Sequence, residues 1–158
     1  MALTPTAIAT PSLSLEPVSL EDARAVMAGD MSAISAGEGW PHDGTFDGLR
    51  HALDGGHAPG WFVVLDAIVI GDCGTHGDPD PEGEVELGFG LAAPYRGRGY
   101  GTEVARGLSD WLLAQPGVTR VIGRVEPDNT ASRRALERVG FALDSSGPRY
   151  LRYTRSRD

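Results

Sequence analysis

The segment EVELGFGLAAPYRGRGYGTE, residues Glu84–Glu103, decides the fold because it carries a strand into a helix through a glycine-rich turn. Hydrophobic residues occupy every second position of its first eight residues, which is the period of a strand with one face in the core. Gly97, Gly99 and Gly101 then alternate with an arginine and a tyrosine ahead of an apolar helical repeat. Glycine loses the most backbone freedom on folding, so three ordered glycines in one turn predict a specific task for that turn.

The turn is predicted to bind an anion. It follows a strand and opens the helix predicted over residues 102–115, where backbone N–H groups lack helical partners and the helix dipole favours negative charge. Arg96 and Arg98 add positive charge beside those groups. The sequence therefore predicts a phosphate cradle at this helix start. The chain contains no lysine, which excludes the nucleotide-triphosphate loop that needs one.

The other face of the same strand carries two carboxylates and two glycines. Glu84, Glu86, Gly88 and Gly90 alternate with the core-facing positions. Glycine weakens a strand and often marks the close approach of a ligand or another backbone. This face is therefore a candidate reaction surface, with a solvated strand face as the alternative.

The remaining elements alternate between helices and strands and indicate a mixed α and β fold. The apolar run 118–125 predicts a strand parallel to strand 84–91, because a helix joins the two. The other predicted strands cover residues 13–18, 61–65, 68–74, 141–144 and 150–154, and the other predicted helices cover residues 20–28, 45–53 and 130–139. Residues 1–12 are predicted to form a loose tail, and residues 13–158 a single domain.

Composition narrows the class of protein. The 158 residues suffice for one domain with its own core, and the single cysteine, Cys73, excludes an intramolecular disulfide. Residues 1–95 hold two arginines against 15 acidic residues, whereas residues 96–158 hold 12 arginines against seven acidic residues. This asymmetry favours a cationic ligand in the first part and an anionic ligand in the second, although an acidic protein with a basic end has the same counts. No apolar stretch reaches membrane-spanning length, so the protein is expected to be soluble and cytoplasmic.

Two motifs together resemble the Gcn5-related N-acetyltransferases (GNAT superfamily), most closely the branch that includes the ribosomal-protein N-terminal acetyltransferases. The first motif, ELGFGLAAPYRGRGYGTEVARGL, places the family's loop signature on Arg96, Gly99 and Gly101. The second motif, VEPDNTASRRALERVGF, places its signature on Asn129, Ser132, Gly140 and Phe141. The resemblance implies a GNAT fold, with a central mixed, mostly antiparallel sheet of six or seven strands, about four flanking helices, and parallel central strands that splay apart.

The resemblance also implies that the bound anion is the pyrophosphate of coenzyme A, with acetyl-coenzyme A as co-substrate and no metal. The coenzyme A side would span residues 84–141, and the acceptor side residues 13–83. Backbone groups near Leu91 would bind the pantetheine arm and polarise the thioester carbonyl, a contribution typically worth about 3–4 kcal/mol. The residues expected to bind coenzyme A are Leu91, Arg96, Gly97, Arg98, Gly99, Tyr100, Gly101, Thr102, Asn129 and Arg133.

The implied reaction is attack of a primary amine on the acetyl thioester. An alkylammonium has a pKa of about 10, so a base must first remove a proton. Glu86 is the candidate base, directly or through a water, with Glu84 as the alternate, and attraction of the ammonium is the alternative role of both. Many relatives place a tyrosine acid seven residues after the asparagine, where this chain has Leu136. By resemblance Ser132 is the replacement acid, although Ser132 and Asn129 both have helix capping as an alternative role.

The acceptor pocket is expected to use Trp40, His42, Trp61 and Glu84 for a small amine or a protein N-terminus, and the family often forms homodimers. A second class of function stays open: an acyl-coenzyme A sensor without activity, or a weak RNA-binding module that uses the arginine-rich end, Arg149–Arg157. The net charge of −8 and the lack of aromatic-rich RNA-binding signatures make nucleic acid the less favoured partner.

Overall fold

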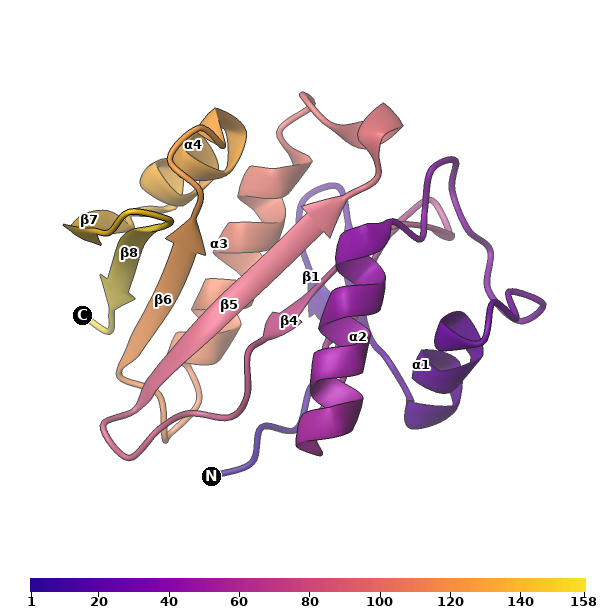
Figure 1. The fold of residues 1–158 in the computed structure, drawn as a ribbon, viewed down its shortest axis with the longest axis horizontal. Helices are drawn as coiled ribbons and strands as arrows, with labels where there is room; N and C mark the ends of the chain where they lie inside the picture. The colour runs from indigo at the N-terminus through magenta and orange to yellow at the C-terminus, as the bar shows by residue number, and fades with distance from the viewer.

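The computed structural model describes residues 1–158 as a central sheet with helices on both faces (Figure 1). The eight strands lie in the order β1-β2-β3-β4-β5-β6-β8-β7, and only β5 and β6 pair in parallel. The strands are β1 (Ile8–Ala9), β2 (Ser14–Pro17), β3 (Trp61–Leu65), β4 (Ile68–Thr75), β5 (Glu84–Leu91), β6 (Arg120–Val125), β7 (Ala142–Ser146) and β8 (Leu151–Ser156). The helices are α1 (Leu20–Met27), α2 (Asp43–Gly55), α3 (Tyr100–Leu113) and α4 (Thr130–Val139). This arrangement confirms the predicted mixed, mostly antiparallel fold.

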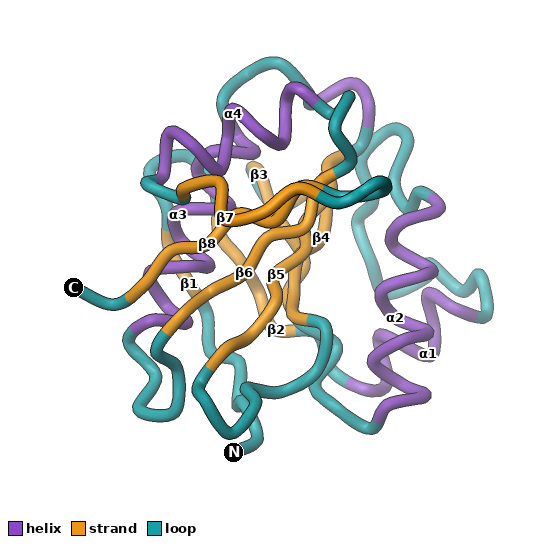
Figure 2. The backbone as a smooth tube through the Cα atoms, turned by 60° about the vertical axis from the view of Figure 1, so that its left-hand side comes forward, coloured by secondary structure: helices purple, strands orange, loops and turns teal.

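The helices form two layers, one on each face of the sheet (Figure 2). Helix α3 buries Val104, Leu108 and Leu112 against one face, in the larger of two hydrophobic cores. Helices α1 and α2 cover the other face over a smaller core that includes Trp40 and Phe62. The polar side of β5 therefore lies on the α2 side. None of the helices combines the length and the apolar content that crossing a membrane requires.

Strands β5 and β6 are paired at one end and separate at the other. Their pairing runs from Glu84 beside Arg120 to Glu86 beside Ile122. Beyond that point β5 continues to Leu91 along β4, whereas β6 continues along β8. The splayed parallel strands implied by the resemblance are therefore present, and they open a gap in the hydrogen bonding at the centre of the sheet.

Residues 1–12 are not the loose tail that the sequence predicts. Strand β1 pairs with β2, and Leu3 is only 8% exposed. Thr6 serves two indoles: its carbonyl accepts from Nε1 of Trp61 at 2.8 Å, and its Oγ1 accepts from Nε1 of Trp111 at 2.9 Å. The indole N–H of a packed tryptophan needs an acceptor, and Thr6 supplies one to each of these two rings. Strand β1 also brings the sheet to eight strands instead of the six or seven expected.

Capping side chains set the helix starts near the site. Ser19 caps α1 and Asn129 caps α4. Helix α2 starts earlier than predicted because Nδ1 of His42 accepts from the Thr45 N–H at 3.3 Å. Residues 29–39 contain turns and an isolated bridge that pairs Ala36 with Val69 of β4.

Candidate functional site

The glycine turn between β5 and α3 has a backbone suited to an anion. Gly97 and Gly99 adopt left-handed φ angles of 76° and 83°, a region that costs other residues roughly 1–2 kcal/mol. Gly99 is the N-cap of α3, and no side chain caps the helix there. The first N–H groups of α3, from Tyr100, Gly101 and Thr102, therefore lack a side-chain acceptor and point out of the helix start.

Two arginines hold this turn in place. Nε of Arg96 donates to the carbonyl of Leu91 at 2.9 Å, which ties the turn back to the end of β5. The guanidinium of Arg98 lies 6.0 Å from the ring centre of Tyr95, a cation–π arrangement. Both arginines are exposed. They add positive charge to the turn while shaping it.

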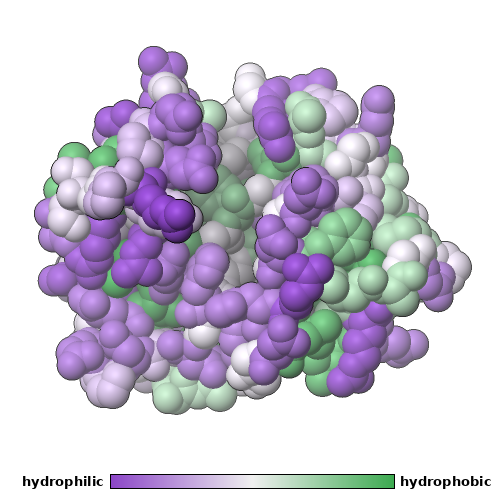
Figure 3. Space-filling view, viewed as in Figure 1, coloured by the Kyte–Doolittle hydropathy of each residue, from purple (hydrophilic) through white to green (hydrophobic).

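A cleft of about 630 Å³ lies where β5 and β6 separate. In Figure 3 a hollow with hydrophobic side chains at its floor runs between the polar surface of the C-terminal strands and that of α2. The residues around the cleft include Glu86, Gly123, Asn129, Ser132, Leu136 and Tyr150. The cleft thus joins the splayed strands to the first turn of α4.

The backbone of β5 offers hydrogen-bonding groups to this cleft. The carbonyl of Glu86 accepts from the N–H of His76, and the N–H of Ala92 donates to the carbonyl of Ile70. The even-numbered positions of β5 therefore bond to β4. Because backbone groups alternate in direction along a strand, those of the odd-numbered residues 87–91 point toward β6, which no longer pairs with them.

The start of α4 contributes Ser132 to the cleft but turns Arg133 away from it. Oδ1 of Asn129 accepts from the N–H of Ser132 at 3.2 Å, so Asn129 acts as a helix cap. Arg133 donates to the carbonyl of Pro127 at 3.0 Å and to Oη of Tyr153 at 3.3 Å. The bond to Tyr153 raises the pKa of the Arg133 guanidinium above its ordinary value. Arg133 is therefore fixed against its own helix start and does not extend toward the glycine turn.

Leu136, at the position of the family's tyrosine, is packed in the core. Leu136 is 1% exposed, and its Cδ1 lies 2.8 Å from the point where a Cβ on Gly123 would stand. A phenol reaches the same cleft from elsewhere, because Tyr150 lies in the turn between β7 and β8 and borders the cleft. Tyr150 is 47% exposed. The cleft therefore contains two hydroxyl groups, those of Ser132 and Tyr150.

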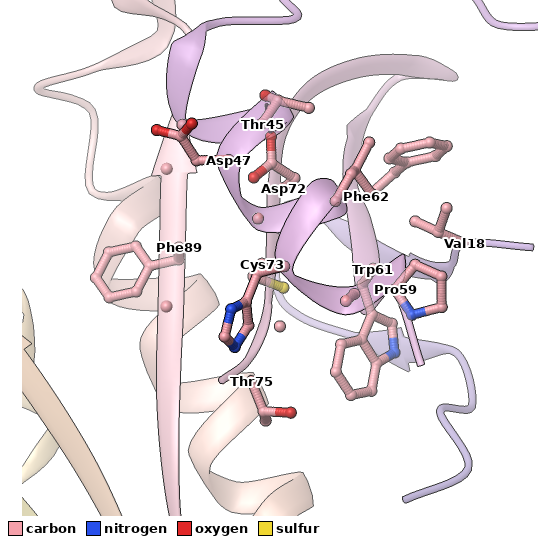
Figure 4. A pocket seen from close by; sticks show the side chains of 18 of the residues that line it. Val18, Thr45, Asp47, Pro59, Trp61, Phe62, Asp72, Cys73, Thr75 and Phe89 are labelled. Atoms are coloured by element: carbon pink, nitrogen blue, oxygen red, sulfur yellow. Dashed lines mark hydrogen bonds between the residues drawn. The ribbon is translucent and has the colours of Figure 1, made fainter. Parts of the chain in front are cut away.

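A second cavity, of about 460 Å³, lies between α2 and strands β4 and β5 (Figure 4). Asp72 and Thr45 lie at one end and Thr75 at the other, with Cys73 between them. The predicted residues His42 and Trp61 both border this cavity. Trp40 does not, because its ring packs edge-on against Phe62 in the core under α2 and is 5% exposed.

Asp72 is a carboxylate held in a fixed position in this cavity. Its Oδ2 accepts from Nε1 of Trp40 at 2.9 Å and from Oγ1 of Thr45 at 2.5 Å. Nε2 of His42 lies 3.7 Å from the same oxygen. Charged acceptors make stronger hydrogen bonds than neutral ones. With Oδ2 so engaged, Oδ1 of Asp72 is left for a cationic group in the cavity.

Cys73 borders the cavity as a buried, free thiol. The residue is buried, and burial, followed by the charge of Asp72, raises the pKa of its thiol well above the ordinary value of 9.0. Nucleophilic attack requires the thiolate. Acyl transfer through this cysteine is therefore disfavoured at neutral pH.

The two carboxylates predicted as bases both lie in ion pairs. Oε1 of Glu86 lies 2.5 Å from Arg124, and Glu84 pairs with Arg120 at 3.3 Å and Arg152 at 3.4 Å. Glu86 borders the cleft, but Glu84 borders neither the cleft nor the second cavity. Glu84 stands at the closed end of the β5–β6 pair, where its carboxylate pairs with Arg120 and Arg152, and its contact with substrate stays a prediction.

Comparison with known proteins gives the family. Residues 12–142 match the profile of the acetyltransferase (GNAT) domain. The chain belongs to the GNAT acetyltransferases. The uncharacterised N-acetyltransferase YjdG of Bacillus subtilis (strain 168) is 36% identical over 92 residues, which are 57% of this chain and 55% of YjdG. The match thus spans about half the length of that relative.

Solved GNAT structures share the architecture. An acetyltransferase from Agrobacterium tumefaciens str. C58 is 29% identical with a TM-score of 0.65, and the alignment covers 98% of this chain and 96% of that one. RimL, a ribosomal α-N-protein acetyltransferase in complex with coenzyme A, has a TM-score of 0.70 at 17% identity, with 96% and 98% covered. The likeness to RimL concerns the fold alone.

In this GNAT domain five of the predicted site residues border two neighbouring cavities. The cleft has Glu86, Asn129 and Ser132 on its walls, and the turn 96–102 follows the end of β5. The second cavity has His42 and Trp61. Glu84 and Trp40 lie outside both cavities, and their substrate roles stay predictions.

Three further side chains at these cavities were not identified from the sequence. Asp72 is a charged residue inside an apolar strand, and that contrast is the one feature of the sequence that could have indicated it. His76 follows the end of β4, and its position over β5 depends on the strand register. Tyr150 reaches α4 only through the β7–β8 hairpin, so no local pattern indicates it.

Proposed function

We propose that the protein transfers an acetyl group from acetyl-coenzyme A to a primary amine by direct attack within a ternary complex. One observation carries the proposal: the cleft and the second cavity meet on β5, where Gly88 and Phe89 border both. A thioester in the cleft and an amine in the cavity would therefore approach each other at this point. The protonated, buried thiol of Cys73 favours direct transfer over an acyl-enzyme.

Acetyl-coenzyme A fits the cleft and the glycine turn. The start of α3 has no side-chain cap, and Gly97 and Gly99 have the left-handed backbone that lets N–H groups surround a phosphate. The backbone groups of residues 87–91 that point toward β6 suit the amide groups of a pantetheine arm. RimL, which shares the fold, has coenzyme A bound in its solved structure, and this supports coenzyme A as the ligand.

The acceptor cavity suits one ammonium group on a body of moderate size. Its volume of about 460 Å³ is within the range of ligand pockets, roughly 300–1,000 Å³. Asp72 supplies a negative charge at one end. A small monoamine or the first residues of a peptide are the acceptors that we propose, the second being the class named for RimL. A cytoplasmic location and a homodimer remain predictions.

The RNA-binding alternative is less supported, because the C-terminal arginines are engaged within the protein. Arg152 pairs with Glu84 and Asp144, and Arg155 pairs with Asp110. Arg157 donates to backbone carbonyls at the end of α3. These contacts leave few free guanidinium groups for phosphates at that end of the chain.

The test separates an enzyme from a sensor. Calorimetry should show saturable binding of acetyl-coenzyme A, and a panel of monoamines, free N-terminal peptides, polyamines and aminoglycosides should include acceptors that release coenzyme A thiol. Binding without thiol release across the panel would indicate a sensor. A lack of binding at high micromolar acetyl-coenzyme A would contradict the proposal altogether.

A further inference from the structure

We propose that His76 is the general base of the acetyl transfer, in place of the glutamate on β5. This inference rests on the proposed function. His76 is the one titratable side chain that borders both the coenzyme A cleft and the acceptor cavity. A base must reach a proton on the acceptor amine while the amine faces the thioester. The junction of the two cavities is the place that meets this requirement.

The imidazole of His76 occupies space that Gly88 leaves open. The backbone N–H of His76 donates to the carbonyl of Glu86 at 2.9 Å, which fixes the residue beside β5. Its Nε2 then lies 3.0 Å from the point where a Cβ on Gly88 would stand. A Cβ at position 88 would make a tight contact with this nitrogen. The glycine on the polar face of β5 therefore makes room for an imidazole.

The other candidate bases are committed elsewhere. Glu86 is ion-paired with Arg124 and borders the cleft but not the acceptor cavity. Nδ1 of His42 accepts from the Thr45 N–H, so the ring's proton resides on Nε2, which faces Asp72 and is closed to solvent. His42 thus has no free lone pair in the cavity.

The remaining histidines are also less suited. His51 borders the acceptor cavity alone, and its ring centre lies 5.6 Å from that of His76. His57 borders neither cavity, and its Nδ1 lies 3.2 Å from the carbonyl of Ala58. By contrast, His76 is exposed, and its ring makes no hydrogen bond within the protein. Imidazole is also the side chain whose ordinary pKa is nearest to neutrality, which suits reversible proton transfer.

The proton and bond changes balance with the groups present. The acceptor ammonium gives one proton to Nε2 of His76, and the neutral amine attacks the thioester carbonyl carbon. The N–C bond forms, the C–S bond breaks, and the second amine proton passes to the coenzyme A sulfur. His76 then releases its proton to solvent. Its titratable surroundings are His51 on α2, Glu86 on β5 with Arg124 on β6, and Tyr150 from the β7–β8 turn.

The test compares His76→Gln with His57→Gln, which alters a histidine of the same cluster outside both cavities. We expect His76→Gln to lower kcat by about 100-fold or more, with the acetyl-coenzyme A Kd and the Tm within error of the wild type. In His76→Gln the acidic limb of the plot of kcat/KM against pH should disappear. In His76→Gly, added imidazole should restore part of the activity. His57→Gln should keep the wild-type profile.

The outcomes separate this inference from the function beneath it. If His76→Gln keeps the acidic limb of its pH profile, the assignment of His76 alone is overturned. The same holds if imidazole does not restore activity to His76→Gly. Equal losses in His76→Gln and His57→Gln would do the same. A wild-type protein that releases no thiol with any amine would overturn the proposed function as well.

Discussion

The carboxylate of Glu86 on β5 is ion-paired with Arg124 on β6 at 2.5 Å, just where the two strands begin to separate. Glu86→Gln is therefore expected to loosen the mouth of the cleft without removing the base. Because both side chains are partly exposed, the loss in free energy of unfolding should not exceed about 1 kcal/mol. We expect kcat to fall by less than about tenfold, with the acidic limb of the pH profile kept.

Arg124→Gln is the matched control, since it breaks the same ion pair from the other strand. The two single variants and the double variant form a cycle, and their effects on kcat and on unfolding should be similar and not additive. Loss of the acidic limb in Glu86→Gln but not in Arg124→Gln would show that Glu86 itself is the base.

Gly99→Ala tests the backbone of the glycine turn. A Cβ at Gly99 would meet no atom within 4 Å, so the substitution acts through the φ angle of 83° alone. The strain of roughly 1–2 kcal/mol should shift the turn, and we expect the Kd for coenzyme A to rise by about tenfold. Calorimetry with coenzyme A measures this directly.

Gly56→Ala provides the control for Gly99→Ala. Gly56 has a φ angle of 70°, also has open space around its Cα, and ends α2 away from both cavities. It should lower stability by a similar amount while leaving the Kd unchanged. Equal coenzyme A affinity in Gly99→Ala and the wild type would mean that the turn does not bind the pyrophosphate.

The strand–turn–helix segment could be predicted from sequence because its signals are local. The alternation in 84–91, the glycines of the turn and the caps at Ser19 and Asn129 each act within a few residues, and the structure has all of them. The parallel pairing of β5 and β6 also follows from one connecting helix. These local features are enough to predict the fold and the segment expected to bind coenzyme A.

The acceptor side depends on contacts between distant residues, which no local pattern encodes. Trp40 is an aromatic candidate for the acceptor pocket in the sequence, but its ring is buried and its N–H donates to Asp72 on another element. Residues 1–12 are predicted to be a loose tail because no local pattern shows that two distant indole N–H groups donate to Thr6. The sequence predicts Glu86 as the base with Glu84 as the alternate, whereas the pairing of β5 with β6 places an arginine beside each carboxylate.

Asp72→Asn should weaken acceptor binding and leave coenzyme A binding intact. The amide oxygen can still accept from Trp40 and Thr45, so the variant removes the charge while keeping the two hydrogen bonds. Losing a charged hydrogen bond of about 1.5–3 kcal/mol should raise KM for the amine by roughly 10- to 100-fold. Asp47→Asn, at a more exposed part of the same cavity, should change KM little. An unchanged KM in Asp72→Asn would place the ammonium elsewhere.

Tyr150→Phe tests whether the phenol that borders the cleft acts where relatives use a tyrosine of the last helix. If its hydroxyl stabilises the departing thiolate, removal should lower kcat by about tenfold, the value of one hydrogen bond, with little change in the Kd for coenzyme A. Ser132→Ala compares the other hydroxyl in the cleft. Tyr153→Phe is the control, because Tyr153 is buried and its hydroxyl donates to Glu137 at 3.2 Å. Full activity in Tyr150→Phe would leave the thiolate to Ser132 or to water.

The buried thiol of Cys73 predicts how stability depends on pH. Its pKa is raised in the folded protein above the ordinary 9.0, so in alkaline solution the unfolded thiol ionises while the folded thiol stays neutral. The stabilising effect is complete below about pH 9 and is lost as the pH rises above it, because the unfolded state then binds fewer protons. From pH 8 to pH 10 the free energy of unfolding should fall more in the wild type than in Cys73→Ala, by on the order of 1 kcal/mol, measured by urea unfolding. At pH 8 the native thiol should also resist Ellman's reagent, and rapid labelling or equal losses in the two proteins would show that the thiol is accessible.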